Sequence, residues 1–284
     1  MGKTIIITDS GCDIPENIAN ALSDSIKIIP YTICLTNDES YKDNQINKKC
    51  FSQNIDLGIR PIGIRLYKND ILDVLNGLDE KCDEIIFITS SGMLYPDNEV
   101  NIKEAVLEYF ANHIKSRIAI IDSNTTSMAL GFLVLDAARM IDMKCGFDEI
   151  VRYVKTNKSR YRMDVISNDS TILREKRIIS SRQSKLMKNR KKNYLISMSC
   201  FGMLMPIMGR TDIKDIRDIM IERLADYSSY NYAIVSSSLN YDMDYFIECI
   251  GEILDVDPIC SKFSCSNTTF VGTDSISLCY KKKK

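Results

Sequence analysis

Short apolar runs alternate with amphipathic stretches along the first half of the chain. Ile5–Thr8, Ile85–Ile88 and Arg117–Ile121 are rich in β-branched residues and predict strands, and Ile26–Leu35 is a further extended run. Apolar positions at helical spacing predict helices over 15–22, 71–78, 100–110 and 128–141, the second of them after an Asn69/Asp70 cap. Strands that alternate with helices in this way indicate a parallel sheet with helices on its faces.

Hydroxyl and carboxylate side chains follow three of these strands. The turns are Thr8-Asp9-Ser10, Thr89-Ser90-Ser91 and Asp122-Ser123, and Asp97 is the expected N-cap of the helix after the second turn. Because the carboxyl ends of parallel strands meet at one edge of a sheet, we expect the three turns to lie together. The sequence therefore predicts a small-molecule pocket at this edge.

The pattern changes after about residue 160. A hairpin is expected over Tyr194–Ile207 around Phe201-Gly202. The remaining expected elements are helices over 213–224 and 241–254, a strand over 232–236, and two short strands within 268–280. This pattern favours an α+β second domain, so we predict an N-terminal α/β domain over 1–160 and a smaller α+β domain over 161–284, with a ligand pocket between them.

Composition excludes several classes of protein. The 284 residues carry 37 Lys and Arg against 38 Asp and Glu, without the basic surplus of a nucleic-acid-binding protein. No apolar run is long enough to span a membrane, and the N-terminus lacks a signal-peptide pattern, so we expect a cytoplasmic protein. The 10 cysteines are scattered without a C-x-x-C pair, which argues against a structural metal site.

Known catalytic motifs are missing. There is no G-x-S-x-G, and the single histidine, His113, falls in a predicted helix away from the turns, which argues against a Ser-His-Asp triad. Neither a phosphate-binding loop nor a G-x-G-x-x-G motif is present. Asp9, Asp13 and Asp122 have the chemistry to hold a divalent metal, but capping of turns and helices is the favoured interpretation. We expect no catalytic residues, no cofactor and no metal.

Two other segments have alternative interpretations. The basic runs Lys185–Lys192 and Lys281–Lys284 are either a solvated loop and a disordered tail, or a docking surface for an acidic partner or anionic lipid. The Met-rich run Met198–Met208 is interpreted as core, although its soft side chains also suit an irregular lipid cavity.

In order and spacing, the turns resemble the DegV family of bacterial fatty-acid-binding proteins. The residues that carry this resemblance are Thr8–Ser10 with Asp13–Pro15, Ile29–Tyr31, Tyr41–Asp43, Ile88–Ser91, Ile121–Ser127, Leu130-Gly131, Phe201–Pro206 and Arg210-Thr211. The resemblance spans nearly the whole chain. It implies two α/β domains around a long acyl chain, which they present to a separate kinase subunit.

The chain departs from the family pattern where that family binds the carboxylate. Gly63 and Ile64 replace its Thr-Ser pair, Leu94 replaces a second serine, and Phe270 stands at the histidine of its C-terminal motif. The family's G-G-R-I turn reads here Glu175–Ile178, one residue short. Each lost charge-assisted hydrogen bond removes about 1.5–3 kcal/mol, so losing two or three weakens binding by roughly 10³-fold or more.

Other side chains offer substitute donors. Arg65 has the geometry to hold a carboxylate through two hydrogen bonds, although it also fits a solvated arginine before a helix. The resemblance thus predicts a lipid site made by Gly63, Ile64, Arg65, Ser90, Ser91, Leu94, Ser123, Ser127 and Phe270. For a kinase subunit it predicts contacts through Arg177 and Arg210.

The first hypothesis is a non-catalytic carrier of a long-chain fatty acid or related lipid. The alternative is a degenerate paralogue that binds no lipid and acts as a protein-interaction or regulatory module. A phosphotransfer enzyme is a third hypothesis, against which the missing phosphate loop argues. A continuous apolar tunnel would favour the carrier, whereas a core filled by side chains would favour the module.

Overall fold

A computed structural model describes residues 3–78, 82–111, 116–190, 192–227, 232–237, 243–254 and 257–282. His113, Lys191, Lys283 and Lys284, on which predictions were made, lie outside these residues. In the part described, none of the helices combines the length and the apolar character needed to cross a bilayer.

The first half forms the expected layered α/β structure. Its strands are β1 (Thr4–Asp9), β2 (Ile26–Ile29), β3 (Thr32–Cys34), β4 (Ser40–Lys42), β5 (Gly63–Arg65), β6 (Glu84–Thr89) and β7 (Arg117–Asp122). Its helices are α1 (Glu16–Ala21), α2 (Lys48–Asp56), α3 (Lys68–Asn76), α4 (Asn98–Phe110), α5 (Ser127–Asp142) and α6 (Phe147–Asn157), with short 3₁₀ turns η1 (Ser10–Cys12), η2 (Asp43–Gln45) and η3 (Lys158–Arg160).

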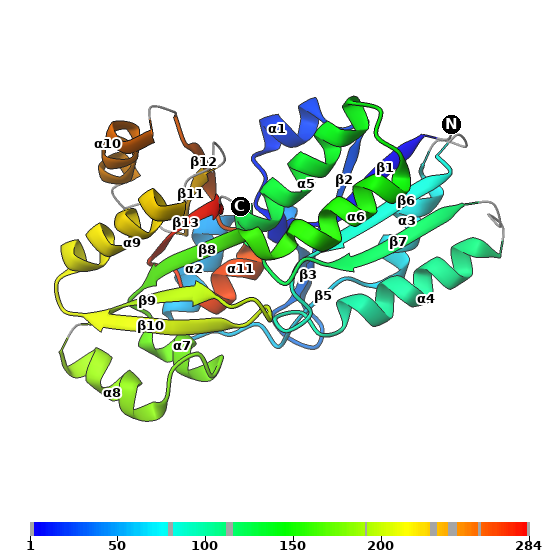
Figure 1. Cartoon of the computed structure of the whole chain (residues 1–284). Helices are drawn as coiled ribbons and strands as arrows, with labels where there is room; N and C mark the ends of the chain where they lie inside the picture. The colour runs from blue at the N-terminus through cyan, green and yellow to red at the C-terminus, as the bar shows by residue number, and fades with distance from the viewer. Residues whose placement is uncertain are drawn as a thin grey trace.

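The central sheet of this half has the strand order β2-β1-β6-β7, and every pair in it is parallel. Its strands are almost continuously apolar because both faces are covered. Figure 1 shows α5 and α6 on one side of the sheet and α4 on the other. The predicted parallel sheet is confirmed.

A second, antiparallel sheet with the order β4-β3-β5 was not expected from the sequence. The run Ile26–Leu35 predicted one extended segment, but it divides into β2 and β3 at Pro30-Tyr31. Pro30 has no N–H to donate to a ladder, which explains the interruption. The chain thereby leaves the parallel sheet and pairs β3 with β5, which carries Gly63, Ile64 and Arg65.

The second half contains a six-stranded sheet of order β10-β9-β8-β13-β11-β12, antiparallel except for the pair β11 and β12. Its strands are β8 (Tyr161–Ser167), β9 (Asn193–Met198), β10 (Leu204–Arg210), β11 (Tyr232–Ser236), β12 (Ile259–Lys262) and β13 (Ser275–Lys281). The helices are α7 (Ser170–Glu175), α8 (Ser181–Asn189), α9 (Ile213–Tyr227), α10 (Met243–Leu254) and α11 (Cys265–Val271).

Three local predictions are wrong. Residues 268–271 of the segment expected to form strands belong to the helix α11, whose start is capped by the side chain of Ser264, which accepts from the N–H of Asn267. Residues 185–189 of the basic segment belong to the helix α8 rather than to a loop, and this helix has a capping box between Ser180 and Gln183. The helix α3 begins at Lys68, before the expected cap.

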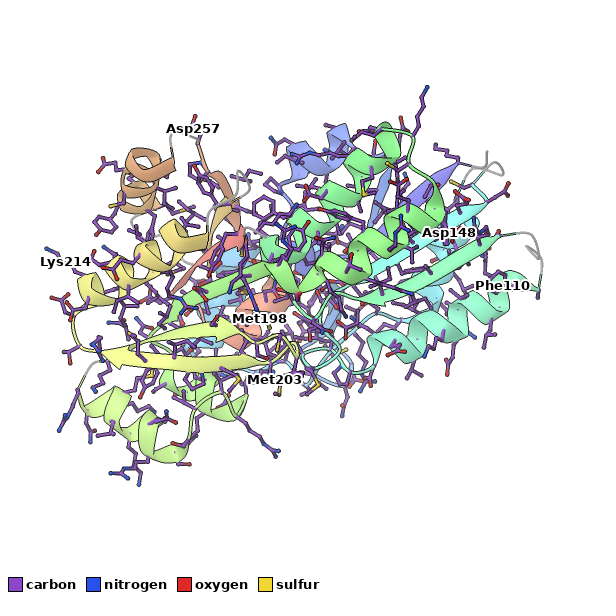
Figure 2. The ribbon with its side chains drawn as sticks, in the orientation of Figure 1. Phe110, Asp148, Met198, Met203, Lys214 and Asp257 are labelled. Carbon is purple, nitrogen blue, oxygen red and sulfur yellow. The ribbon has the colours of Figure 1, made fainter. Side chains whose placement is uncertain are left out.

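The methionine-rich hairpin of β9 and β10 is confirmed in position, with Gly202 at its tip at φ +82°. The prediction that the run Met198–Met208 belongs to the core is right for Met198, which is buried, but wrong for Met203 and Met205, which are exposed. Figure 2 labels Met198 and Met203 at this tip. Alternate positions of a strand face opposite sides of the sheet, so only one face of β10 reaches the core.

One hydrophobic cluster runs through both halves, and a second lies within the second half, where α9 and α10 cover the sheet. Helix α5 packs against β1 and β6 of the first sheet and against β8 and β13 of the third sheet. Strand β8 begins at Tyr161, one residue after the predicted boundary. The core is continuous across this point, and the division into domains over 1–160 and 161–284 remains a prediction.

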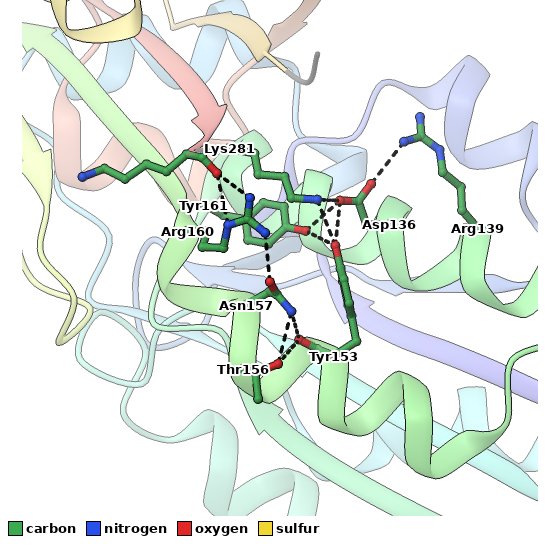
Figure 3. Close-up of polar contacts among 9 residues, drawn as sticks. Asp136, Arg139, Tyr153, Thr156, Asn157, Arg160, Tyr161 and Lys281 are labelled. Carbon is green, nitrogen blue, oxygen red and sulfur yellow. Dashed lines mark hydrogen bonds and ion pairs between the residues drawn. The ribbon is translucent and has the colours of Figure 1, made fainter. Parts of the chain in front are cut away.

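A polar cluster at the C-terminal end of α5 fastens the last strand to the first half (Figure 3). The carboxylate of Asp136 accepts hydrogen bonds from Lys281 Nζ at 2.6 Å and from the Tyr161 hydroxyl at 2.7 Å. Burial acts to raise the pKa of Asp136, but the hydrogen bonds from Lys281 and Tyr161 outweigh it, so that pKa is lowered.

Candidate functional site

The three hydroxyl and carboxylate turns meet at the carboxyl edge of the parallel sheet, as the sequence predicted. Asp9 at the end of β1 accepts hydrogen bonds from the backbone N–H of Ser90 at 2.7 Å and from its hydroxyl at 2.6 Å. Asp122 at the end of β7 accepts from the N–H of Gly92 at 3.0 Å. The turns are therefore cross-linked to each other through carboxylates that act as acceptors.

Two carboxylates are fully enclosed at this edge. Burial raises the pKa of Asp9 to about 6, against the lowering effect of its hydrogen bonds from Ser90 and Gly11. Burial likewise raises the pKa of Asp13 to about 6, although Ser127 donates to it at 2.7 Å. Both carboxylates thus act as hydrogen-bond acceptors that cap backbone turns. In the described part of the chain, no group of three metal-ligating side chains comes together.

Asn267 of α11 joins the two halves of the protein at this point. Its Oδ1 accepts from the hydroxyls of Tyr95 at 3.0 Å and Thr126 at 2.8 Å. Its Nδ2 donates to the carbonyl of Gly11 and to Asp13 Oδ2, both at 2.9 Å. The buried amide therefore uses its full hydrogen-bonding capacity.

The start of α11 is held by two carboxylates of the first half. Asp13 Oδ1 accepts from the N–H of Ser264 at 2.7 Å, and Asp43 Oδ1 accepts from that of Cys265 at 2.8 Å. The hydroxyl of Ser266 also donates to Asp43, at 2.7 Å. Negative charge is favourable at a helix N-terminus, so these contacts fix the position of α11 against the parallel sheet.

Aromatic side chains fill the space between this polar network and β5. The rings of Tyr31 and Tyr95 stack with centroids 4.5 Å apart, and Phe270 meets Tyr95 edge-on at 5.2 Å. Tyr31 and Tyr95 are almost fully buried, and Asn98 donates to the Tyr31 hydroxyl at 2.5 Å. The edge of Phe270 that meets Tyr95 is therefore covered by one of the protein's own side chains.

The four serines predicted as substitute donors all have partners within the protein. Ser90 donates to Asp9 and Ser127 to Asp13, as described above. Ser91 donates to the carbonyl of Gly202 at the tip of the hairpin at 2.9 Å, and Ser123 donates to that of Thr125 at 3.1 Å. These hydroxyls organise the turns and hold the hairpin tip in place.

The residues of β5 lie closer to the surface. Gly63 and Ile64 are half-buried, and Ile64 packs against the core. The guanidinium of Arg65 points to Asp97 at 3.6 Å, and 52% of its side chain is exposed. Arg65 therefore resembles the solvated arginine that the sequence also allowed. Asp97 makes no side-chain cap on α4, because its own backbone is in the right-handed helical region and not in the extended conformation of a capping residue.

The other predicted contacts lie on different parts of the second half. Phe270 is buried, with the ammonium of Lys176 4.6 Å from its ring centroid. Arg177 lies in the turn after α7, and Arg210 ends β10; both are exposed. Their role in binding a partner remains a prediction.

Sequence reasoning missed other polar residues at this edge. Asn267 carried no signal, because it lies next to a segment that was expected to form strands. Among the described residues, the buried hydroxyls of Thr8 and Thr125 have no hydrogen-bond partner. Thr8 belongs to a turn that the sequence singled out, and Thr125 belongs to the segment Ile121–Ser127 that carries the family resemblance; that their hydroxyls lack a partner was not predicted.

An open cleft of about 720 Å³ lies beside this network, between the first half and the strand β12. Asp13, Ile14 and Pro30 line it from one side, and Cys260 and Ser264 line it from the other. None of the residues predicted for the lipid site lines this cleft. The cleft nevertheless lies between the two predicted domains, where a pocket was expected.

Comparisons with known proteins agree on the family. The sequence profile described as "Uncharacterised protein, DegV family" matches residues 3–283. A DegV domain-containing protein of Caldanaerobacter subterraneus subsp. tengcongensis is 32% identical over 165 residues, which are 57% of this chain and 55% of that protein. The chain thus matches about half the length of this curated relative.

Solved structures share the fold at low sequence identity. A DegV family protein from Eubacterium eligens loaded with heptadecanoic acid superposes with a TM-score of 0.85 at 18% identity, covering 99% of this chain and 100% of that one. The Streptococcus pneumoniae Fatty Acid Kinase (Fak) B3 protein loaded with linoleic acid gives 0.80 at 17% identity, with coverage of 99% and 100%. A fatty-acid-binding DegV family protein from Thermus thermophilus gives 0.80 at 15% identity, with coverage of 98% and 99%.

Proposed function

This chain belongs to the DegV family, and from that membership we propose that it binds a long-chain fatty acid or a related lipid without catalysing a reaction. The observation that carries the proposal is its superposition, over nearly its whole length, on family members whose structures hold fatty acids. The apolar chain supplies most of the binding free energy of such a ligand, at about 0.8 kcal/mol for each buried CH₂.

The polar end of the ligand would meet a site unlike the one that the family resemblance implies. The hydroxyls of Ser90, Ser91, Ser123 and Ser127 are engaged, whereas those of Thr8 and Thr125 are not. A buried donor without a partner costs free energy, and a carboxylate that accepted from Thr125 would relieve that cost. We therefore propose Thr125 as a donor to the ligand, alongside the residues predicted from the resemblance.

Mass spectrometry of the denatured protein tests the proposal. We expect a stoichiometric fatty acid in the organic extract, or uptake of added heptadecanoic acid, whose odd chain distinguishes it by mass from even-chain acids of the expression host. Because Arg65 is one of the residues proposed for the ligand, Arg65→Ala is expected to retain less lipid than the matched control Arg182→Ala, at an exposed position of α8. Equal retention in the two variants would leave Arg65 only its pair with Asp97. A folded protein that yields no lipid and takes up none would contradict the carrier function.

A second candidate function is a protein-interaction module that binds no lipid. It is favoured by one observation: Tyr31, Tyr95 and Phe270 pack against each other beside the predicted clamp. In both cases we propose a kinase subunit as the partner, because one structural neighbour is the Fak B3 protein. Arg177→Glu with Arg210→Glu is expected to weaken co-purification with a fatty acid kinase, whereas unchanged binding would exclude these arginines from the contact.

A further inference from the structure

A second cleft, of about 620 Å³, lies between α2 and the carboxyl ends of β11 and β12. The two strands pair in parallel, and their last residues, Ser236 and Lys262, are directly paired in register. A crevice outside the carboxyl ends of parallel strands is a common place for a ligand in α/β proteins. The volume is also in the range typical of small-molecule sites.

The charge in this cleft is one-sided. Lys48, Lys49 and Lys262 line it, and the single carboxylate in its described lining, Asp56, accepts a hydrogen bond from Thr273. None of the three ammonium groups lies within 4.0 Å of a carboxylate in the described residues. The whole chain has a net charge of −1, so this positive surplus belongs to the cleft and not to the protein in general.

Two of these lysines stand at the start of a helix, and the carboxylate of Asp13, which is attracted to Lys48, offsets part of the positive charge there. Lys48 and Lys49 occupy the first turn of α2, which contains no acidic residue, and Lys48 Nζ donates to the carbonyl of Phe263 at 2.9 Å. The N-terminus of a helix carries partial positive charge, so cations there are repelled and an anion is attracted. A local electrostatic conflict of this kind is typical of a binding site.

The donors for an anion in this lining come from the lysines. Ser237 and Thr268 donate their protons to backbone carbonyls, so their hydroxyls have no proton left for an anion. Phe51 and Phe263 are buried and form an apolar floor. The three lysines around one cleft fit a doubly charged anion better than the single charge of a fatty acid.

From the lysines around this cleft, we infer that it binds a small molecule that carries a phosphate group. This site is separate from the serine turns and does not depend on lipid binding. Isothermal titration of the intact protein with inorganic phosphate, adenosine monophosphate and adenosine tests it. We expect saturable one-to-one binding of the two phosphate compounds, weakened by salt, and no binding of adenosine.

The charge-reversed pair Lys49→Glu with Lys262→Glu is the decisive variant, because both side chains are exposed and make no ion pair with a described residue. We expect at least about tenfold weaker phosphate binding, which corresponds to about 1.4 kcal/mol. The matched control is Lys155→Glu with Lys188→Glu, which makes the same change in net charge on exposed positions of α6 and α8. The neutral pair Lys49→Gln with Lys262→Gln replaces the first variant if that variant loses its thermal unfolding transition.

Three results would overturn the inference. The first is the absence of saturable binding by either phosphate compound. The second is equal weakening in the cleft variant and in the control, which would show non-specific attraction to net positive charge. The third is binding of adenosine as tight as that of its monophosphate. None of these outcomes bears on lipid content, so this test and that of the carrier function fail independently.

Discussion

Asp13 and Asn267 lie 254 positions apart in the sequence, yet Asn267 Nδ2 donates to Asp13 Oδ2 at 2.9 Å in the buried centre of the protein. This contact joins the turn after β1 to α11, and through it the parallel sheet to the second half. The carboxylate of Asp13 lies between donors from two segments: Ser127 of α5, and Ser264 and Asn267 at the start of α11. The relationship leads to the first prediction.

Asn267→Ala removes the acceptor of Tyr95 and Thr126 and one donor to Asp13. Because it leaves buried polar groups without partners, we expect the free energy of unfolding to fall by about 2–4 kcal/mol. Urea denaturation followed by circular dichroism measures this change. Asn189→Ala, at the exposed end of α8, is the control and is expected to stay within about 0.5 kcal/mol of the parent. A loss below about 1 kcal/mol for Asn267→Ala is on the order of one ordinary hydrogen bond. Such a result would show that the hydrogen bonds of this network do not stabilise the protein cooperatively.

Stability is expected to depend on pH through Asp9. Its pKa is about 6 in the folded protein against an ordinary value of 3.8, so the folded state binds more protons between these values. The contribution of Asp9 to the free energy of unfolding is therefore highest below about pH 4. It declines by on the order of 3 kcal/mol as the pH rises toward and through 6.

Asp9→Asn is expected to flatten this pH dependence, because the amide does not titrate. Urea midpoints measured across this range for the parent, for Asp9→Asn and for the exposed Asp73→Asn separate the buried group from surface carboxylates. Identical slopes in all three proteins would contradict a raised pKa at Asp9.

Gly202→Ala tests the attachment of the hairpin tip. A Cβ at this position would lie 2.1 Å from Ser91 Oγ, and the residue has φ +82°. Gly58 is the matched control, since it has φ +88° but no atom within 4 Å of the position that a Cβ would take. We expect a loss of about 1 kcal/mol for Gly58→Ala and at least about twice that for Gly202→Ala, measured by chemical denaturation. Equal losses would show that only the backbone conformation matters at the tip.

Thr125→Val and Thr126→Val are expected to act in opposite directions at neighbouring positions. The Thr125 hydroxyl is buried without a partner, so the isosteric valine leaves stability unchanged or raises it by up to about 1 kcal/mol. Thr126 donates to Asn267, so the same substitution there lowers stability by about 1–2 kcal/mol. Thermal unfolding of the lipid-free proteins compares them, and a large loss for Thr125→Val would reveal a partner of its hydroxyl.

Lipid retention by Thr125→Val completes this comparison. If Thr125 donates to the ligand, the variant is expected to retain less heptadecanoic acid even though the protein is as stable as the parent. Retention equal to that of the parent would remove Thr125 from the ligand site.

Much of the fold follows from local sequence. The alternation of short β-branched runs with amphipathic stretches specifies β1, β6 and β7 and the helices α1, α3 and α4, because hydrophobic periodicity depends only on residues close in the chain. Helix α2 was not predicted. The convergence of the turns at Asp9, Ser90 and Asp122 also follows, since parallel strands place their carboxyl ends at one edge. The family could be identified from the order of these turns.

The tertiary structure alone decides which polar side chains remain available. Nothing near Ser90 in the sequence indicates that Asp9 takes its hydroxyl, and nothing near Arg65 indicates the pair with Asp97. The helix α11 likewise depends on donors and carboxylates that lie more than 200 positions apart, as between Asp43 and Cys265. A sequence pattern thus fixes where functional groups gather, but their hydrogen-bond partners come from distant segments, because folding brings these together only when the whole core is assembled.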